Sequence, residues 1–89
     1  MTDEQLLRAL QSVGMTAFMT NLALFKSSLG NSDAAAELEM QNGWTTTACR
    51  TRVSHARRIL AQGREKDALQ LIAASRLSEE IRSAARRML

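Results

Sequence analysis

Apolar residues recur every three or four positions along most of this chain, and glycines interrupt the pattern at positions 14, 30, 43 and 63. This spacing puts side chains on one face of an α-helix, and glycine ends helices readily because it tolerates left-handed backbone conformations. The most apolar face is predicted within Thr16–Leu29, and it consists of Phe18, Met19, Leu22, Phe25 and Leu29. We expect this face to form the centre of the core. The alternative is that the Phe and Met side chains of this face form an exposed groove that binds a partner.

The composition favours the same all-α fold. The chain has no proline or tyrosine and few aromatic residues, and much of its apolar content is alanine. Alanine and leucine favour helices, whereas strands are enriched in β-branched and aromatic residues. An 89-residue chain is long enough for one modest core. We therefore predict a single helical domain over residues 1–89, built as a compact bundle of five or six short helices.

Caps and apolar spacing set the expected helix bounds. The predicted helices are Thr2–Val13 with a capping box at Thr2 and Gln5, Thr16–Leu29 with Thr16 as N-cap, Asp33 to about Met40 behind Ser32, Thr45 or Thr46 to about Gln62, Arg64–Ser75, and Leu77–Leu89 with Ser75 or Ser78 as cap. The last two would form one long helix if they are not interrupted. The fourth helix is expected to turn Cys49, Val53, Ala56 and Leu60 inward.

The basic residues are concentrated in one segment. Residues 41–64 carry five arginines and no Asp or Glu, whereas residues 1–40 have a net charge of −3 and residues 65–89 a net charge of +1. A concentrated basic segment is typical of a surface that binds a polyanion. The simpler alternative is a solvated helix face.

The basic segment resembles the helix-turn-helix of sigma-factor region 4 and, more loosely, related response-regulator DNA-binding domains. Gly43 and Trp44 match the family's Gly-apolar pair, and Thr45 matches its Ser/Thr cap. Residues 50–53, Arg-Thr-Arg-Val, match the basic core of the family's recognition helix, and residues 56–60 match its Ala-Arg…Leu ending. The preceding residues 34–38 resemble the supporting helix. Residues 39–42 make the connection two or three residues longer than in the family, and bulky Trp44 replaces an aliphatic residue.

The resemblance implies a helix-turn-helix over about residues 33–62, followed by C-terminal helices over about residues 64–89. In this family the start of the second helix enters the major groove of double-stranded DNA. Base contacts are then expected from Thr46, Thr47, Arg50 and Thr51. Phosphate contacts are expected from Thr45, Arg52, His55, Arg57, Arg58 and Arg64.

We expect a sequence-specific DNA-binding protein, such as a small bacterial, phage or plasmid transcriptional regulator. Such proteins often read two half-sites as dimers, and the apolar series proposed for a homodimer contact is Leu77, Ile81, Ala84 and Met88. The alternative is that this series closes the chain's own core. Residues 62–69 also resemble the junction between the two helices of a tetratricopeptide repeat, which we interpret as an ordinary antiparallel helix pair.

Two other functions stay open. One is a helical protein-interaction module (an adaptor, chaperone or inhibitor) whose basic face meets an acidic partner. The other is RNA binding, which is less favoured because few aromatic side chains are available to stack on bases. An enzyme is not expected: the lone histidine, His55, lacks a second metal ligand at suitable spacing, and Cys49 lies on the apolar face. No cofactor, membrane span or signal peptide is expected, and one cysteine fits a cytoplasmic protein.

Overall fold

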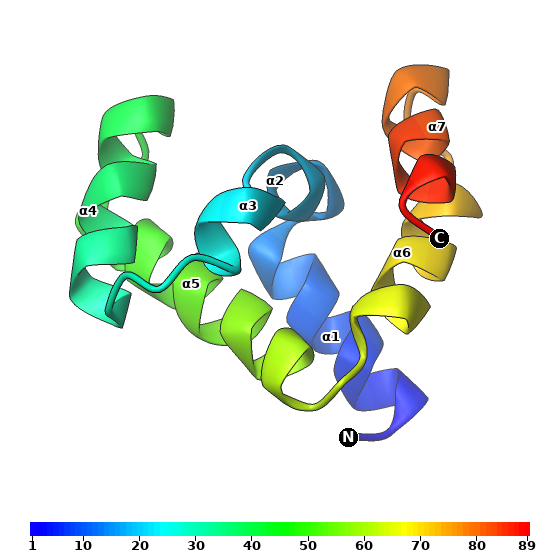
Figure 1. Ribbon diagram of the computed structural model, residues 1–89, viewed down its shortest axis with the longest axis horizontal. Helices are drawn as coiled ribbons and strands as arrows, with labels where there is room; N and C mark the ends of the chain where they lie inside the picture. Colours follow the sequence, from blue (N-terminus) through cyan, green and yellow to red (C-terminus); the bar gives the residue numbers. More distant parts are fainter.

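The computed structural model covers residues 1–89 and contains seven α-helices and no strand (Figure 1). The helices are α1 (Asp3–Val13), α2 (Met15–Thr20), α3 (Leu22–Phe25), α4 (Asn31–Asn42), α5 (Thr46–Ala61), α6 (Glu65–Ala73) and α7 (Glu79–Arg87). The prediction of an all-α fold is therefore confirmed. No helix is both long and apolar enough to span a lipid bilayer.

The longest helix, α5, lies between α1 and α4 and contacts both. Its inward face consists of Cys49, Val53, Ala56 and Ile59. The prediction was right for the first three, but Ile59 takes the fourth position, and Leu60 is only half-buried. The small side chains Cys49 and Ala56 allow the neighbouring helices to approach closely.

The start of α1 forms as its sequence predicted. The hydroxyl oxygen of Thr2 accepts a hydrogen bond from the Gln5 amide at 3.1 Å, and the Gln5 side chain accepts one from the Thr2 amide at 3.0 Å. This reciprocal pair is the expected capping box. The helix ends at Gly14, whose φ of 88° suits glycine and strains other residues.

The predicted helix Thr16–Leu29 is wrong in its bounds. It begins at Met15, with Gly14 rather than Thr16 at the N-cap, is interrupted at Asn21, and ends at Phe25. The buried Asn21 amide donates to the Ala17 carbonyl at 3.0 Å, and its oxygen accepts from the Asn42 amide at 3.2 Å. Such side-chain bonds compete with the helical pattern, so a tertiary contact to α4 fixes the break.

The interpretation of Phe18 and Phe25 as core residues is confirmed. Both are buried, and their ring centroids lie 6.4 Å apart. A partner groove formed by these two side chains is therefore wrong. Leu29, which the period placed on the same face, is 41% exposed because the helix has already ended at Phe25.

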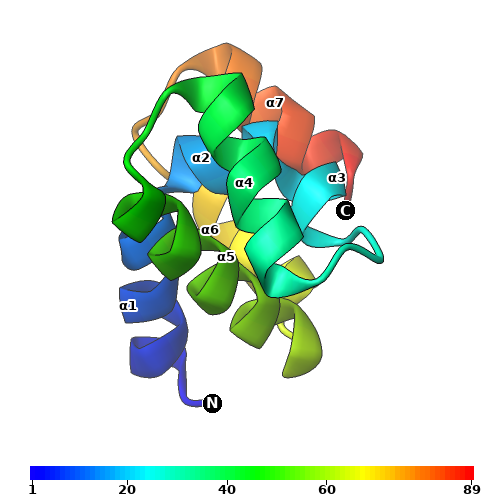
Figure 2. The ribbon, with the colours of Figure 1, turned by 90° about the vertical axis from the view of Figure 1, so that its left-hand side faces the viewer.

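The connection between α4 and α5 is shorter than the sequence suggested. Helix α4 starts at Asn31 behind Gly30, so Ser32 is not its N-cap, and it continues to Asn42. Gly43 then takes a left-handed conformation, and its amide donates to the Glu39 carbonyl at 2.8 Å. Thr45 caps α5 by accepting from the Ala48 amide at 3.2 Å. Three residues thus join α4 to α5, and the two helices contact each other (Figure 2).

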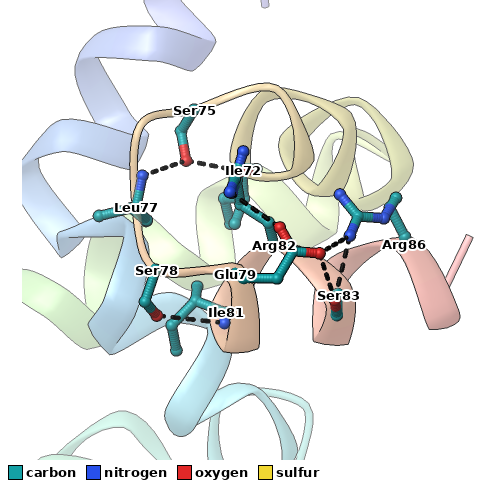
Figure 3. Close-up of polar contacts among 9 residues, drawn as sticks. All are labelled: Ile72, Ser75, Leu77, Ser78, Glu79, Ile81, Arg82, Ser83 and Arg86. Atoms are coloured by element: carbon teal, nitrogen blue, oxygen red, sulfur yellow. Dashed lines mark hydrogen bonds and ion pairs between the residues drawn. The ribbon is translucent and has the colours of Figure 1, made fainter.

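The last two helices are separate. Between them, the Ser75 hydroxyl donates to the Ile72 carbonyl at 2.6 Å and accepts from the Leu77 amide at 3.3 Å, and Ser78 caps α7 (Figure 3). The Glu79 carboxylate accepts hydrogen bonds from the Ser83 hydroxyl and the Arg86 guanidinium. These bonds, with the nearby charges of Arg86 and Arg82, lower the pKa of Glu79.

The series predicted for a dimer contact does not form a free apolar face. Leu77 and Ile81 are half-buried and contact the chain's own core. Ala85, rather than Ala84, is the buried alanine of α7, and Met88 is 47% exposed. Closure of the same core therefore accounts for Leu77 and Ile81.

Candidate nucleic-acid interface

The outward face of α5 is polar and carries no acidic side chain. Its exposed residues form what we call the α5 stripe, defined as Thr47, Arg50, Thr51, Ser54 and Arg58. The spacing of three to four residues places these side chains on one side of the helix. The six ion pairs of the chain involve neither Arg50 nor Arg58, so both guanidinium groups are available to a ligand.

Thr46 is set apart from the rest of the predicted base-contacting residues. Its hydroxyl donates to the Glu39 carboxylate, with oxygen distances of 3.1 and 3.3 Å. A carboxylate beside the first turn of α5 also suits the positive end of the helix dipole. The structure therefore brings Thr47, Arg50 and Thr51 together on the stripe, whereas the hydroxyl of Thr46 is already bound to Glu39.

Arg52 binds the end of α1. Its guanidinium donates to the Val13 carbonyl at 2.7 Å and lies 4.0 Å from the centre of the Trp44 ring. A cation over an aromatic face is attracted by the ring quadrupole. Arg52 therefore links the C-terminus of α1 to the turn before α5.

Arg57 holds the segment between α3 and α4. Its guanidinium donates to the Phe25 carbonyl at 3.1 Å, the Ser27 carbonyl at 3.3 Å and the Asn31 side-chain oxygen at 2.8 Å. These bonds fix a stretch that belongs to no helix. Because neither Arg52 nor Arg57 is neutralised by an acid, both still add positive potential beneath the α5 stripe.

Arg64, which directly precedes α6, binds residues at the N-terminal end of the chain. It donates to the Met1 carbonyl and the Asp3 carboxylate, each at 2.5 Å, and to Asp67 at 2.6 Å. Hydrogen bonds to Asp67 and Asp3 raise the pKa of its guanidinium. Three of the arginines predicted to meet phosphates are thus bound within the chain.

Two hollows lie beside α5. One, of about 190 Å³, is lined by Gln5, Arg8, Ala9, Ser12, His55 and Arg58. The other, of about 310 Å³, is lined by Asn31, Ser32 and Arg50. No acid lines either hollow, although Arg8 pairs with Glu4 at 2.7 Å. Sequence reasoning missed Arg8, Ser12, Asn31 and Ser32, because only the packing of α1 and α4 brings them to α5.

Cys49 has the features of a core residue. It is fully buried, and burial, followed by the charge of Glu39, raises the pKa of its thiol, while Arg52 acts in the opposite direction. The thiolate is the reactive form of cysteine, so the environment disfavours nucleophilic chemistry. No group of three or more His, Cys, Asp or Glu side chains is placed to hold a metal ion.

We expect the folded protein to resist thiol alkylation near neutral pH. Iodoacetamide, followed by mass spectrometry, should modify Cys49 only as fast as the chain opens, and unfolding in urea should make the reaction fast. The pKa of the Cys49 thiol is higher in the folded chain than in the unfolded chain. The stability that the protonated thiol contributes is therefore fully present below the unfolded pKa and is lost as the pH rises through the folded pKa. Rapid alkylation of native protein at neutral pH contradicts this prediction.

No protein-family model matches the chain, and neither a curated protein nor a solved structure shows significant similarity to it.

Proposed function

We propose that this protein binds double-stranded DNA, with α5 inserted in the major groove. The observation that carries the proposal is the acid-free α5 stripe, which lies between two hollows that each contain an unpaired arginine. The major groove is about 12 Å wide and admits one α-helix, with a phosphate backbone on either side. The polar face of α5 has this arrangement, with Arg58 and Arg8 on one side and the uncapped N-terminus of α4 on the other.

The proposed contacts differ from those expected at first. Thr47, Arg50 and Thr51 reach base edges, because arginine pairs with guanine and threonine methyl groups contact thymine. Arg58 and His55, with Arg8 and Ser12 from α1, meet one phosphate backbone. The opposite backbone meets the N-terminus of α4 at Asn31 and Ser32, where no side chain caps the free amides. We further propose that the protein acts as a small transcriptional regulator.

The test is fluorescence anisotropy with labelled duplex DNA at several salt concentrations. The salt dependence counts only the phosphates that cationic side chains neutralise. With two to three such phosphates, the slope of log K against log salt should be about −2 to −3. Replacing both Arg50 and Arg58 with alanine should weaken binding at least about 30-fold, because charge-assisted contacts are lost. The matched control is Lys66→Ala together with Arg76→Ala, which removes two exposed basic side chains outside the stripe.

Two results overturn the proposal. One is folded protein that does not bind duplex DNA at about 50 mM salt, where phosphate contacts are strongest. The other is an equal loss of affinity in the control variant, which indicates attraction by net charge alone. Tighter binding to single-stranded RNA than to duplex DNA reassigns the stripe to RNA.

A further inference from the structure

A groove between α1 and α6 is the second notable surface of the molecule. It has a volume of about 530 Å³ and is lined by Asp3, Glu4, Leu6, Leu7, Arg64, Asp67, Gln70 and Leu71. Leu7 is 37% exposed and Leu71 is half-buried, so apolar surface faces solvent there. None of the α5 stripe lines this groove.

The rim of the groove is acidic. Asp3, Glu4 and Asp67 face a single arginine, Arg64, which is already bound to both aspartates. Glu4 also has a partner in the chain, Arg8 at 2.7 Å, but its side chain stays 75% exposed at the rim. An occupant should therefore carry apolar side chains beside positive charge.

The end of α7 has the complementary chemistry. Met88 and Leu89 are 47% and 48% exposed, and they directly follow Arg86 and Arg87. Arg86 is paired with Glu79, whereas Arg87 forms no ion pair. We call residues 86–89 the α7 end. Because Leu7 and Met88 both stay exposed, the α7 end does not fill the groove of its own chain.

We propose that the α1/α6 groove binds the α7 end of a second copy of this chain. Leu7 and Leu71 then contact Met88 and Leu89, while Glu4 faces Arg87. The contact joins two different surfaces, so it gives either a reciprocal dimer or a longer head-to-tail series. It goes beyond the proposed function, since no DNA takes part.

The first experiment uses a synthetic peptide with the sequence of residues 79–89 as a labelled probe. Fluorescence anisotropy should show saturable binding to the full chain, and Leu7→Ser should weaken it at least about tenfold by removing apolar contact. Met40→Ser is the matched control, because Met40 is the most exposed large apolar residue and lies on α4. Circular dichroism confirms that both variants are folded.

The second experiment exchanges the charges and measures sedimentation velocity without DNA. Glu4→Lys and Arg87→Glu should each weaken self-association about tenfold or more, because like charges then face each other. The double variant, or an equimolar mixture of the two single variants, should recover it. An exclusively monomeric protein up to about 1 mM, where even weak association is detectable, overturns the proposal, as does failure of the double variant to recover. Neither result bears on DNA binding.

Discussion

Replacing Arg57 with alanine is expected to lower the free energy of unfolding by about 2–3 kcal/mol, with a fall in Tm of roughly 10–20 °C. The guanidinium donates three hydrogen bonds to the segment from Phe25 to Asn31. Its removal leaves two backbone carbonyls without those donors and frees residues 26–30, which belong to no helix. Urea denaturation followed by circular dichroism measures the change.

Arg58 is the matched control for this prediction. It is adjacent in sequence and equally charged, yet it is exposed and forms no ion pair. Arg58→Ala should therefore change the free energy of unfolding by no more than about 0.5 kcal/mol. Equal destabilisation by the two substitutions is incompatible with the distinct roles assigned to these arginines.

Phe18→Ala is expected to have the largest effect on stability, a loss of about 3–5 kcal/mol. Phe18 is fully buried, contacts Phe25, and is one of only two phenylalanines in the chain. A chain of this length is typically stable by roughly 4–13 kcal/mol. Many of its core side chains are alanines, which contribute little burial each, so this variant should be close to unfolded at 37 °C.

Scanning calorimetry with a conservative variant tests the cause of this loss. Phe18→Leu keeps most of the buried apolar surface and should cost about 1–2 kcal/mol. A similar loss in both variants indicates that the aromatic ring itself, rather than the filled volume, is required. No loss in either contradicts the central position of Phe18.

Local signals in the sequence were sufficient for much of the fold. The capping box at Thr2 and Gln5 formed as predicted, and of the two caps considered for α5, Thr45 and Thr46, it is Thr45 that forms; both features depend on neighbours within three residues. The burial of Phe18 and Phe25 followed from their apolar character and spacing. The break at Asn21 did not, because it depends on Asn42, which is 21 residues away. Spacing alone predicted an uninterrupted helix there.

The candidate interface was predictable only in part. The exposed position of Arg50 and Arg58 on α5 follows from helical spacing. Charge alone, however, does not distinguish an arginine that faces solvent from Arg52 or Arg57, which bind carbonyl groups of distant segments. The hollows beside α5 also needed α1 and α4 in place. The sequence therefore predicts the basic helix, but not which of its arginines face solvent and which bind other segments of the chain.

The arginine bonds to distant backbone also bear on how fast this protein folds. Arg52 contacts a residue 39 positions earlier, Arg57 contacts residues 26 to 32 positions earlier, and Arg64 contacts residues 61 and 63 positions earlier. Folding rates fall as the mean sequence separation of contacts rises. The helices can form early from local interactions, but the ends of α1, the α3–α4 segment and the N-terminus are fixed only after residues 52–64 have joined them.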